Sequence, residues 1–197
     1  MAGTEVDVLK KHVLTLARKY SDRLRRARRV FVEERAVALA SDREVEYSVK
    51  ESISQFFGIK YSEIAFAGSA QVGFSAHKNR PFVKAVSDLD VACVSSDLFQ
   101  IAWADVITAT RAFTDATKFA GLREGEVDRF KDGILRRGMI RVEIMPRSEL
   151  SMRWKSFEDS LSREYATYFG GINVAIYLNE YAFCWKQDSA ISSILRG

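Results

Sequence analysis

The chain has 197 residues, and 30 Lys and Arg against 26 Asp and Glu give it a formal net charge of +4. A hydrophobic content of 47% with only two prolines is typical of a folded domain and excludes a disordered chain. Two cysteines and two histidines are too few for a cysteine-based zinc site, a disulfide framework or a histidine-rich metal site. The apolar runs are too short to cross a bilayer and the first residues lack a signal peptide, so we expect a cytoplasmic protein without membrane contact.

The positive charge is concentrated in one stretch. Residues 18–29 hold seven basic side chains and one acid, which leaves 23 basic and 25 acidic residues in the remainder. Such a block often binds an acidic partner, although a solvated helix face gives the same pattern. We therefore expect a docking surface for a protein or a nucleic acid, formed by Arg25, Arg26, Arg28 and Arg29.

The first 40 residues are predicted to form one long helix. Apolar residues recur at steps of three and four from Val6 to Phe31, which is the spacing of one helix face. We assign residues 1–40 to an N-terminal helical segment. Residues 41–197 are assigned to a catalytic domain that packs with this segment into a single compact unit.

The rest of the chain alternates between helical and strand patterns. The spacing of apolar residues within 180–195 fits either a helix or a strand. Their order predicts an α+β fold in which a mixed sheet has helices packed on one side. The predicted elements are a helix between the capping signal at Ser41 and Gly58, strands at 63–67 and 88–94, helices at 97–120 and 127–136, a strand at 139–145, a helix at 148–165 and a strand at 172–178.

Two acidic residues stand two apart on the strand at 88–94. Asp88 and Asp90 therefore project from the same face, where each raises the pKa of the other unless a cation lies between them. Mg²⁺ resolves that conflict because it favours one or two carboxylates together with phosphate oxygens. Glu143 projects from another predicted strand and is a candidate third carboxylate. Three such groups can hold two metal ions for nucleotidyl transfer.

Groups suited to phosphate surround these acids in the sequence. Gly68 and Ser69 end a predicted strand, where glycine lets the backbone approach closely and the hydroxyl can donate to a phosphate oxygen. Arg141 shares a face with Glu143, so it can contact a triphosphate or pair with a carboxylate. Lys186 follows a cluster of aromatic residues and is a further candidate phosphate contact.

Three segments, FAGSAQVGF, SDLDVACV and RVEIMP, together resemble the catalytic core of the DNA polymerase β-like nucleotidyltransferase superfamily. Its signature is a strand ending in Gly-Ser, a strand with Asp-x-Asp and a later strand with a third acid. The resemblance covers about residues 45–147. It implies a palm-like fold in which Asp88, Asp90 and Glu143 are catalytic and bind Mg²⁺ or Mn²⁺, and in which Gly68 and Ser69 hold the triphosphate.

The chain departs from this pattern in two places. Eighteen residues separate Ser69 from Asp88, more than is usual in the family, and an inserted loop at 76–86 would explain the excess. The third acid is a glutamate where aspartate is commoner, but glutamate also ligates metal.

The resemblance implies an enzyme that transfers an NMP or dNMP from a nucleoside triphosphate to a hydroxyl and releases pyrophosphate. Little chain is attached to the core, so we expect a minimal nucleotidyltransferase, active in antiphage defence through the synthesis of short nucleotide oligomers or DNA. Two alternatives are an antitoxin that nucleotidylates a partner toxin and an inactive binding module. The module would bind a protein or nucleic acid through the basic cluster.

Overall fold

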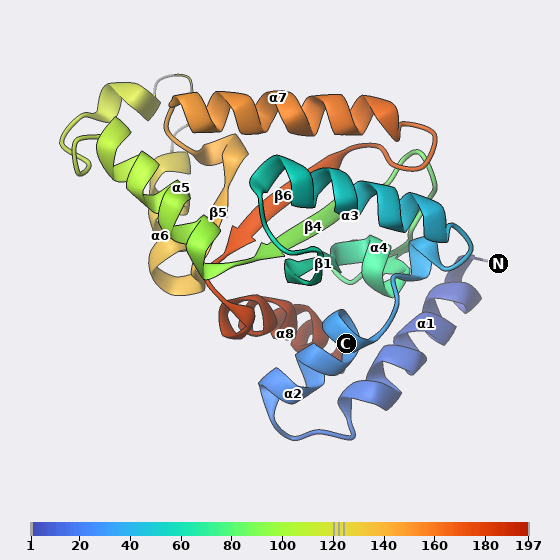
Figure 1. Cartoon of the computed structure of the whole chain (residues 1–197). Coiled ribbons are helices and arrows are strands. Elements are labelled where there is room, and N and C mark those ends of the chain that lie inside the picture. Colours follow the sequence, from blue (N-terminus) through green and yellow to red (C-terminus); the bar gives the residue numbers. More distant parts are fainter. Residues whose placement is uncertain (1, 120, 122, 124, 197) are drawn as a thin grey trace.

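A four-stranded mixed sheet forms the centre of the molecule (Figure 1). The computed structural model describes residues 2–119, 121, 123 and 125–196. The central strands β4 and β6 are parallel, while β1 and β5 pair antiparallel with them at the two edges. The predicted α+β class with a mixed sheet is confirmed. The strand order is β1 (Ile64–Ala67), β4 (Leu89–Val94), β6 (Ile172–Tyr177) and β5 (Met139–Arg141).

Helices cover both faces of the sheet, so the prediction of helices on one side is wrong. Val91 and Cys93 of β4 belong to one buried cluster, whereas Ala92 belongs to a second cluster on the opposite face. A central strand with apolar residues on both faces needs cover on both. The first cluster includes residues of α3 (Arg43–Phe57), α5 (Ser96–Ala109), α6 (Glu126–Arg137) and α7 (Glu149–Glu164), and the second includes residues of α1 (Ala2–Ala17), α2 (Arg23–Arg28), α4 (Gly68–Val72) and α8 (Glu180–Arg196).

The predicted long N-terminal helix is divided in two. The helix α1 ends at Ala17, and Asp22 starts α2 by accepting a hydrogen bond from the Arg25 amide at 2.8 Å. A π-helical turn and a 3-10 turn follow at 29–33 and 37–39. The predicted stripe, apart from Tyr20, nevertheless lies in one buried cluster together with side chains of α8. The spacing of three and four between apolar residues continues across the turn between α1 and α2. The spacing alone therefore could not show that a new helix begins after Asp22.

Most other predicted elements are present, and two are shorter than predicted. The segment at 180–195, whose spacing fitted either a helix or a strand, is the helix α8. The helix α5 ends at Ala109 and the chain continues through a 3-10 turn at 116–119. The strand predicted at 139–145 ends at Arg141, because Val142–Ile144 turns into a 3-10 helix. The predicted insertion at 76–86 begins directly after β2 (Phe74–Ser75) and contains β3 (Arg80–Pro81), and the two strands pair as a small hairpin.

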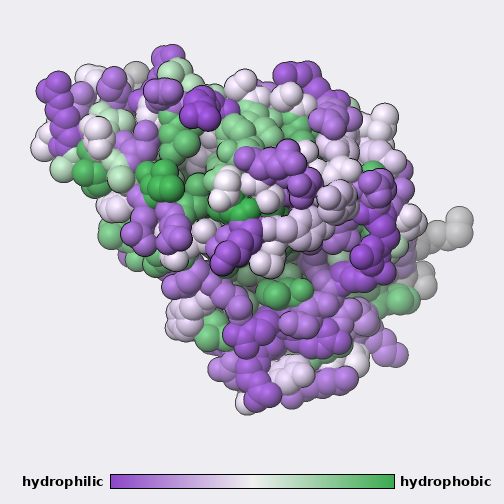
Figure 2. All heavy atoms as spheres, viewed as in Figure 1, coloured by the Kyte–Doolittle hydropathy of each residue, from purple (hydrophilic) through white to green (hydrophobic). Residues whose placement is uncertain are grey.

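The outer surface is rich in polar side chains over the N-terminal helices. Figure 2 shows mainly hydrophilic side chains over α1 and α2 in the lower part of the view. In the described part of the chain, no helix has both the length and the apolar composition needed to traverse a bilayer.

Candidate active site

One face of the sheet opens into a cavity of about 1370 Å³. Asp90 and Ala92 of β4 lie beside Asn173 and Ala175 of β6, and all four line this cavity. Residues two apart on a strand share a face, so each strand supplies one polar group and one methyl group there. The small alanines leave space between the sheet and α8, and Lys186 of α8 lines the same cavity.

Gly68 packs directly against Asp90. The strand β1 pairs with β4 so that Ala67 stands opposite Asp90, and the chain then turns at Gly68 with a φ of 61°. A Cβ atom at Gly68 would overlap Asp90 Oδ2 and lie 3.1 Å from Asp90 Cγ. Only glycine combines this left-handed backbone with so close an approach. Ser69 follows within α4 and also lines the cavity.

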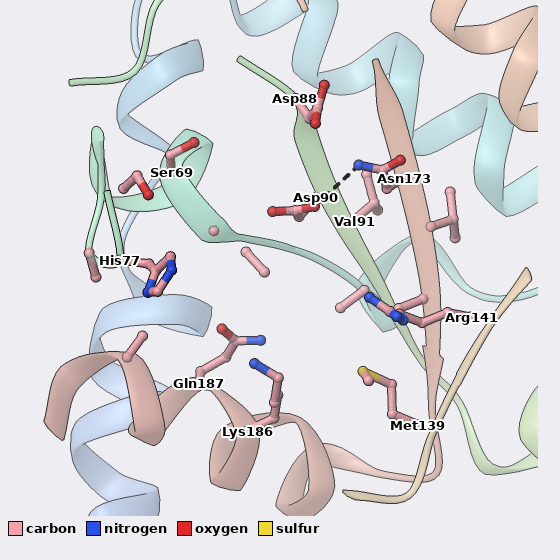
Figure 3. Close-up of a pocket in the computed structure, with 18 of the residues that line it drawn as sticks. Ser69, His77, Asp88, Asp90, Val91, Met139, Arg141, Asn173, Lys186 and Gln187 are labelled. Carbon is pink, nitrogen blue, oxygen red and sulfur yellow. Dashed lines mark hydrogen bonds between the residues drawn. The ribbon is translucent and has the colours of Figure 1, made fainter. Parts of the chain in front are cut away.

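The carboxylates of Asp88 and Asp90 face the same cavity (Figure 3). Asp90 is exposed to the cavity, but the surrounding protein displaces part of its hydration, and this desolvation is the main cause of its raised pKa; the neighbouring Asp88 raises it further. Asn173 Nδ2 lies 3.5 Å from Asp90 Oδ1, a long contact that lowers the pKa of Asp90 in opposition to burial. Sequence reasoning missed Asn173, whose position beside Asp90 depends on the pairing of β4 with β6.

Several cationic side chains line the cavity, and three of them interact with one another. Lys186 comes from α8, Arg141 from the end of β5 and Arg137 from the last turn of α6. Burial lowers the pKa of Lys186, the positive charges of Arg137 and Arg141 lower it further, and Asp90 acts against them. The predicted phosphate contacts Arg141 and Lys186 thus come together, joined by Arg137, which the sequence analysis did not single out. Such a group of cations suits a polyanion such as a triphosphate.

Glu143 takes a different position from the one predicted. Continued pairing of β5 with β6 would have set Glu143 opposite Asn173, in line with Asp90. The chain instead leaves the sheet after Arg141, and Glu143 Oε1 lies 3.2 Å from Arg141 Nε. Glu143 still lines the cavity. Among the described residues, however, no three His, Cys, Asp or Glu side chains are grouped so that they could hold a metal ion.

The two aspartates suit one metal ion that also binds substrate. Mg²⁺ is commonly held by one or two carboxylates while substrate phosphates and water complete its octahedral shell. Asp90 lies beside a second acid in a partly desolvated position, which raises its pKa and makes a bound cation favourable. Asp88 and Asp90 would therefore hold Mg²⁺ or Mn²⁺, and the remaining ligands would come from the substrate.

A buried glutamate on α7 also reaches the cavity wall. Glu158 accepts a hydrogen bond from the Val174 amide at 2.7 Å. The strand β5 ends at Arg141 and has no residue paired with Val174, so Glu158 satisfies this amide in place of a strand carbonyl. Burial raises the pKa of Glu158 to about 7. No sequence pattern indicated this role, since Glu158 stands among many charged residues of an amphipathic helix.

Most of the predicted arginine docking surface is paired within the chain. Arg26 bonds to the buried Asp188 and Arg28 to Glu180, so these two side chains hold α2 against α8. Arg29 bonds to Glu34 across the π-helical turn that follows α2. The fourth, Arg25, is exposed, and its guanidinium carbon lies 5.1 Å from the centroid of the Tyr20 ring.

In comparisons with protein-family models, with curated proteins and with solved structures, the chain matches none of them.

Proposed function

We propose that the protein is a metal-dependent nucleotidyltransferase with a polymerase β-like core. It transfers an NMP or dNMP from a nucleoside triphosphate to a hydroxyl group and releases pyrophosphate. The observation that carries the proposal is one cavity in which the Asp88 and Asp90 pair, the Gly68 turn packed on Asp90, and the cations Arg141 and Lys186 all meet.

The residues of the cavity divide into two roles. Asp88 and Asp90 would hold Mg²⁺, which when bound would supply neutralisation of the phosphoryl charge and activation of a hydroxyl. Lys186, Arg141 and Arg137 bind the triphosphate oxygens and stabilise the leaving pyrophosphate. Their binding also orients the α-phosphorus toward the acceptor oxygen. That oxygen bonds to the α-phosphorus, the bond to the pyrophosphate oxygen breaks, and the hydroxyl proton leaves to water.

The cavity also favours a second candidate, a module that binds a nucleotide without reacting it. The observation behind it is the position of Glu143, which contacts Arg141 and stands outside the line of Asp90 and Asn173. A site with only two metal-binding carboxylates retains affinity for a nucleotide with Mg²⁺ but lacks the third ligand that a two-metal reaction uses.

One assay separates these candidates. The purified chain is incubated with each labelled ribonucleoside and deoxyribonucleoside triphosphate and with Mg²⁺ or Mn²⁺. Pyrophosphate is measured and the products are separated by size, which distinguishes single transfer, oligomer synthesis and labelling of protein. We expect metal-dependent pyrophosphate release that the double variant Asp88→Asn, Asp90→Asn abolishes. The matched control Asp7→Asn, on the exposed face of α1, leaves it unchanged.

Three results decide between the candidates. Pyrophosphate release that survives the double variant overturns the proposed enzyme. Nucleotide binding by the wild type without pyrophosphate release supports the binding module. Equal activity of Glu143→Gln and wild type shows that two carboxylates are sufficient.

A further inference from the structure

Two aromatic rings on α8 are exposed to solvent one turn apart. Tyr181 is 58% exposed and Trp185 is 46% exposed. Their rings are stacked, with centroids 6.0 Å apart and planes inclined by 11°. The guanidinium carbon of Arg23, from α2, lies 5.4 Å from the centroid of the Trp185 ring. We call Arg23, Tyr181 and Trp185 the stacking surface.

The surroundings of this surface are polar. A groove of about 240 Å³ lies beside Trp185 and is lined by Arg23, Asp188, Ser189 and Ser192. Glu180, which precedes Tyr181 in the chain, forms an exposed ion pair with Arg28. The rings therefore form no part of a broad apolar patch of the kind that a protein partner would cover.

Positive charge lies near the stacking surface. Arg23 Nε is 3.9 Å from Asp188 Oδ2, but Arg26 makes the closer bonds to that carboxylate. Arg18, Lys19 and Arg25 are exposed, and none of them has a described carboxylate oxygen within 4 Å. Trp185 thus lies beside Arg23, whose contact with Asp188 is long because Arg26 makes the closer bonds to that carboxylate.

We propose that the stacking surface binds single-stranded nucleic acid. Bases stack on Trp185 and Tyr181, because every base has a flat face that aromatic rings bind with little sequence preference. Arg23, which lies beside Trp185, contacts the phosphates. A duplex hides its base faces in the helical stack and would leave the two rings without a role.

The inference is independent of the proposed transferase, because it uses no residue of the catalytic cavity. The helix α8 carries Lys186 on its cavity face and Trp185 on its outer face. Binding of a strand and transfer of a nucleotide can therefore be lost separately, and each has its own assay.

Fluorescence anisotropy with a labelled oligothymidylate of about 12 nucleotides measures the binding directly. The wild type binds the strand, and its Kd rises when salt is increased from about 50 to 200 mM. Trp185→Leu raises the Kd roughly 5- to 150-fold, the range for loss of one stacking contact. Arg23→Gln raises the Kd and reduces its salt dependence. The matched control is Tyr47→Leu on α3, because Tyr47 is 51% exposed and also contacts a second ring, that of Tyr61; it leaves the Kd unchanged.

Tryptophan fluorescence gives a second readout in the same titration. The strand quenches the emission of the wild type and has no effect on that of Trp185→Leu, which retains the buried Trp154 and the half-buried Trp103. An oligouridylate of the same length, run in parallel, identifies the preferred sugar, and binding of either strand supports the proposal.

Any one of four binding results overturns the proposal. They are no anisotropy change with the wild type, an unchanged Kd for Trp185→Leu, an equal loss for Tyr47→Leu, and a duplex that binds as tightly as the single strand. Self-association of the wild type that Trp185→Leu abolishes, without strand binding, identifies the surface as an interface between two copies and also overturns it.

Discussion

Two glycines with nearly the same backbone allow the packing of Gly68 on Asp90 to be tested. Gly58 has a φ of 66° and Gly68 a φ of 61°, so an alanine at either position is forced into the left-handed region. A Cβ at Gly58 meets no atom within 4 Å, whereas a Cβ at Gly68 overlaps Asp90 Oδ2. Comparing Gly68→Ala with Gly58→Ala therefore isolates the contact with the carboxylate.

The expected magnitudes differ more for activity than for stability. The left-handed backbone costs about 1–2 kcal/mol in each variant. Asp90 Oδ2 is the end of a rotatable side chain, and its displacement from a favoured rotamer adds about 0.5–1.5 kcal/mol in Gly68→Ala only. An ordinary C···O contact of about 3.3 Å requires that oxygen to move on the order of 1 Å. A misplacement of that size costs about 100-fold in rate.

Urea unfolding followed by circular dichroism measures the free energy of unfolding, and the pyrophosphate assay measures the rate. Binding of Mn²⁺, followed by electron paramagnetic resonance, reports on the carboxylates without depending on turnover. We expect Gly58→Ala to keep wild-type activity and Mn²⁺ affinity, while Gly68→Ala loses both. Wild-type Mn²⁺ affinity in a folded Gly68→Ala protein would refute the close packing of Gly68 on Asp90.

Two ion pairs and one buried acid give three further predictions. Arg26→Leu leaves Asp188, which is 4% exposed, without its main partner, so we expect urea unfolding to show a loss of about 3–5 kcal/mol, and a loss below 1 kcal/mol would contradict the buried pair. Arg28→Leu breaks a pair whose side chains are 50% and 47% exposed, so the same measurement should show a loss of at most about 1 kcal/mol. Folding raises the pKa of Glu158 from 4.5 to about 7, so the folded state binds the proton more tightly and stability falls as the pH rises from 4.5 to 7, by roughly 3 kcal/mol. Glu158→Gln keeps an acceptor for the Val174 amide and should remove most of this fall, and an unchanged pH profile would show that another group titrates.

Local patterns determined the parts of the site that lie on the central strand and beside it. Alternation with a period of two indicated the strand that carries Asp90, and the Gly68–Ser69 turn followed directly from the end of another strand. These features depend on neighbours within a few residues, so a single sequence contains them. The helical stripe from Val6 to Phe31 was correct for the same reason, although the break at Asp22 was missed.

Tertiary structure decided where the remaining charges lie. The end of β5 at Arg141 moved Glu143 out of line with Asp90, and nothing in the alternation of Met139–Met145 indicates where pairing with β6 stops. The bond from Arg26 to Asp188 spans 162 residues and converted part of an expected docking surface into a contact between helices. Long-range pairing depends on the packing of whole elements, and no spacing within one segment encodes it.

The sequence by itself thus determined the residue types of the site and the elements that present them. It supplied Gly68, Ser69, Asp88 and Asp90 in the order that a phosphate and metal site needs. Only the tertiary structure decided which charges meet them, because Lys186 and Arg137 reach the cavity from helices far apart in the chain. Chain order carries no information on that convergence, which is set by how α6 and α8 pack against the sheet.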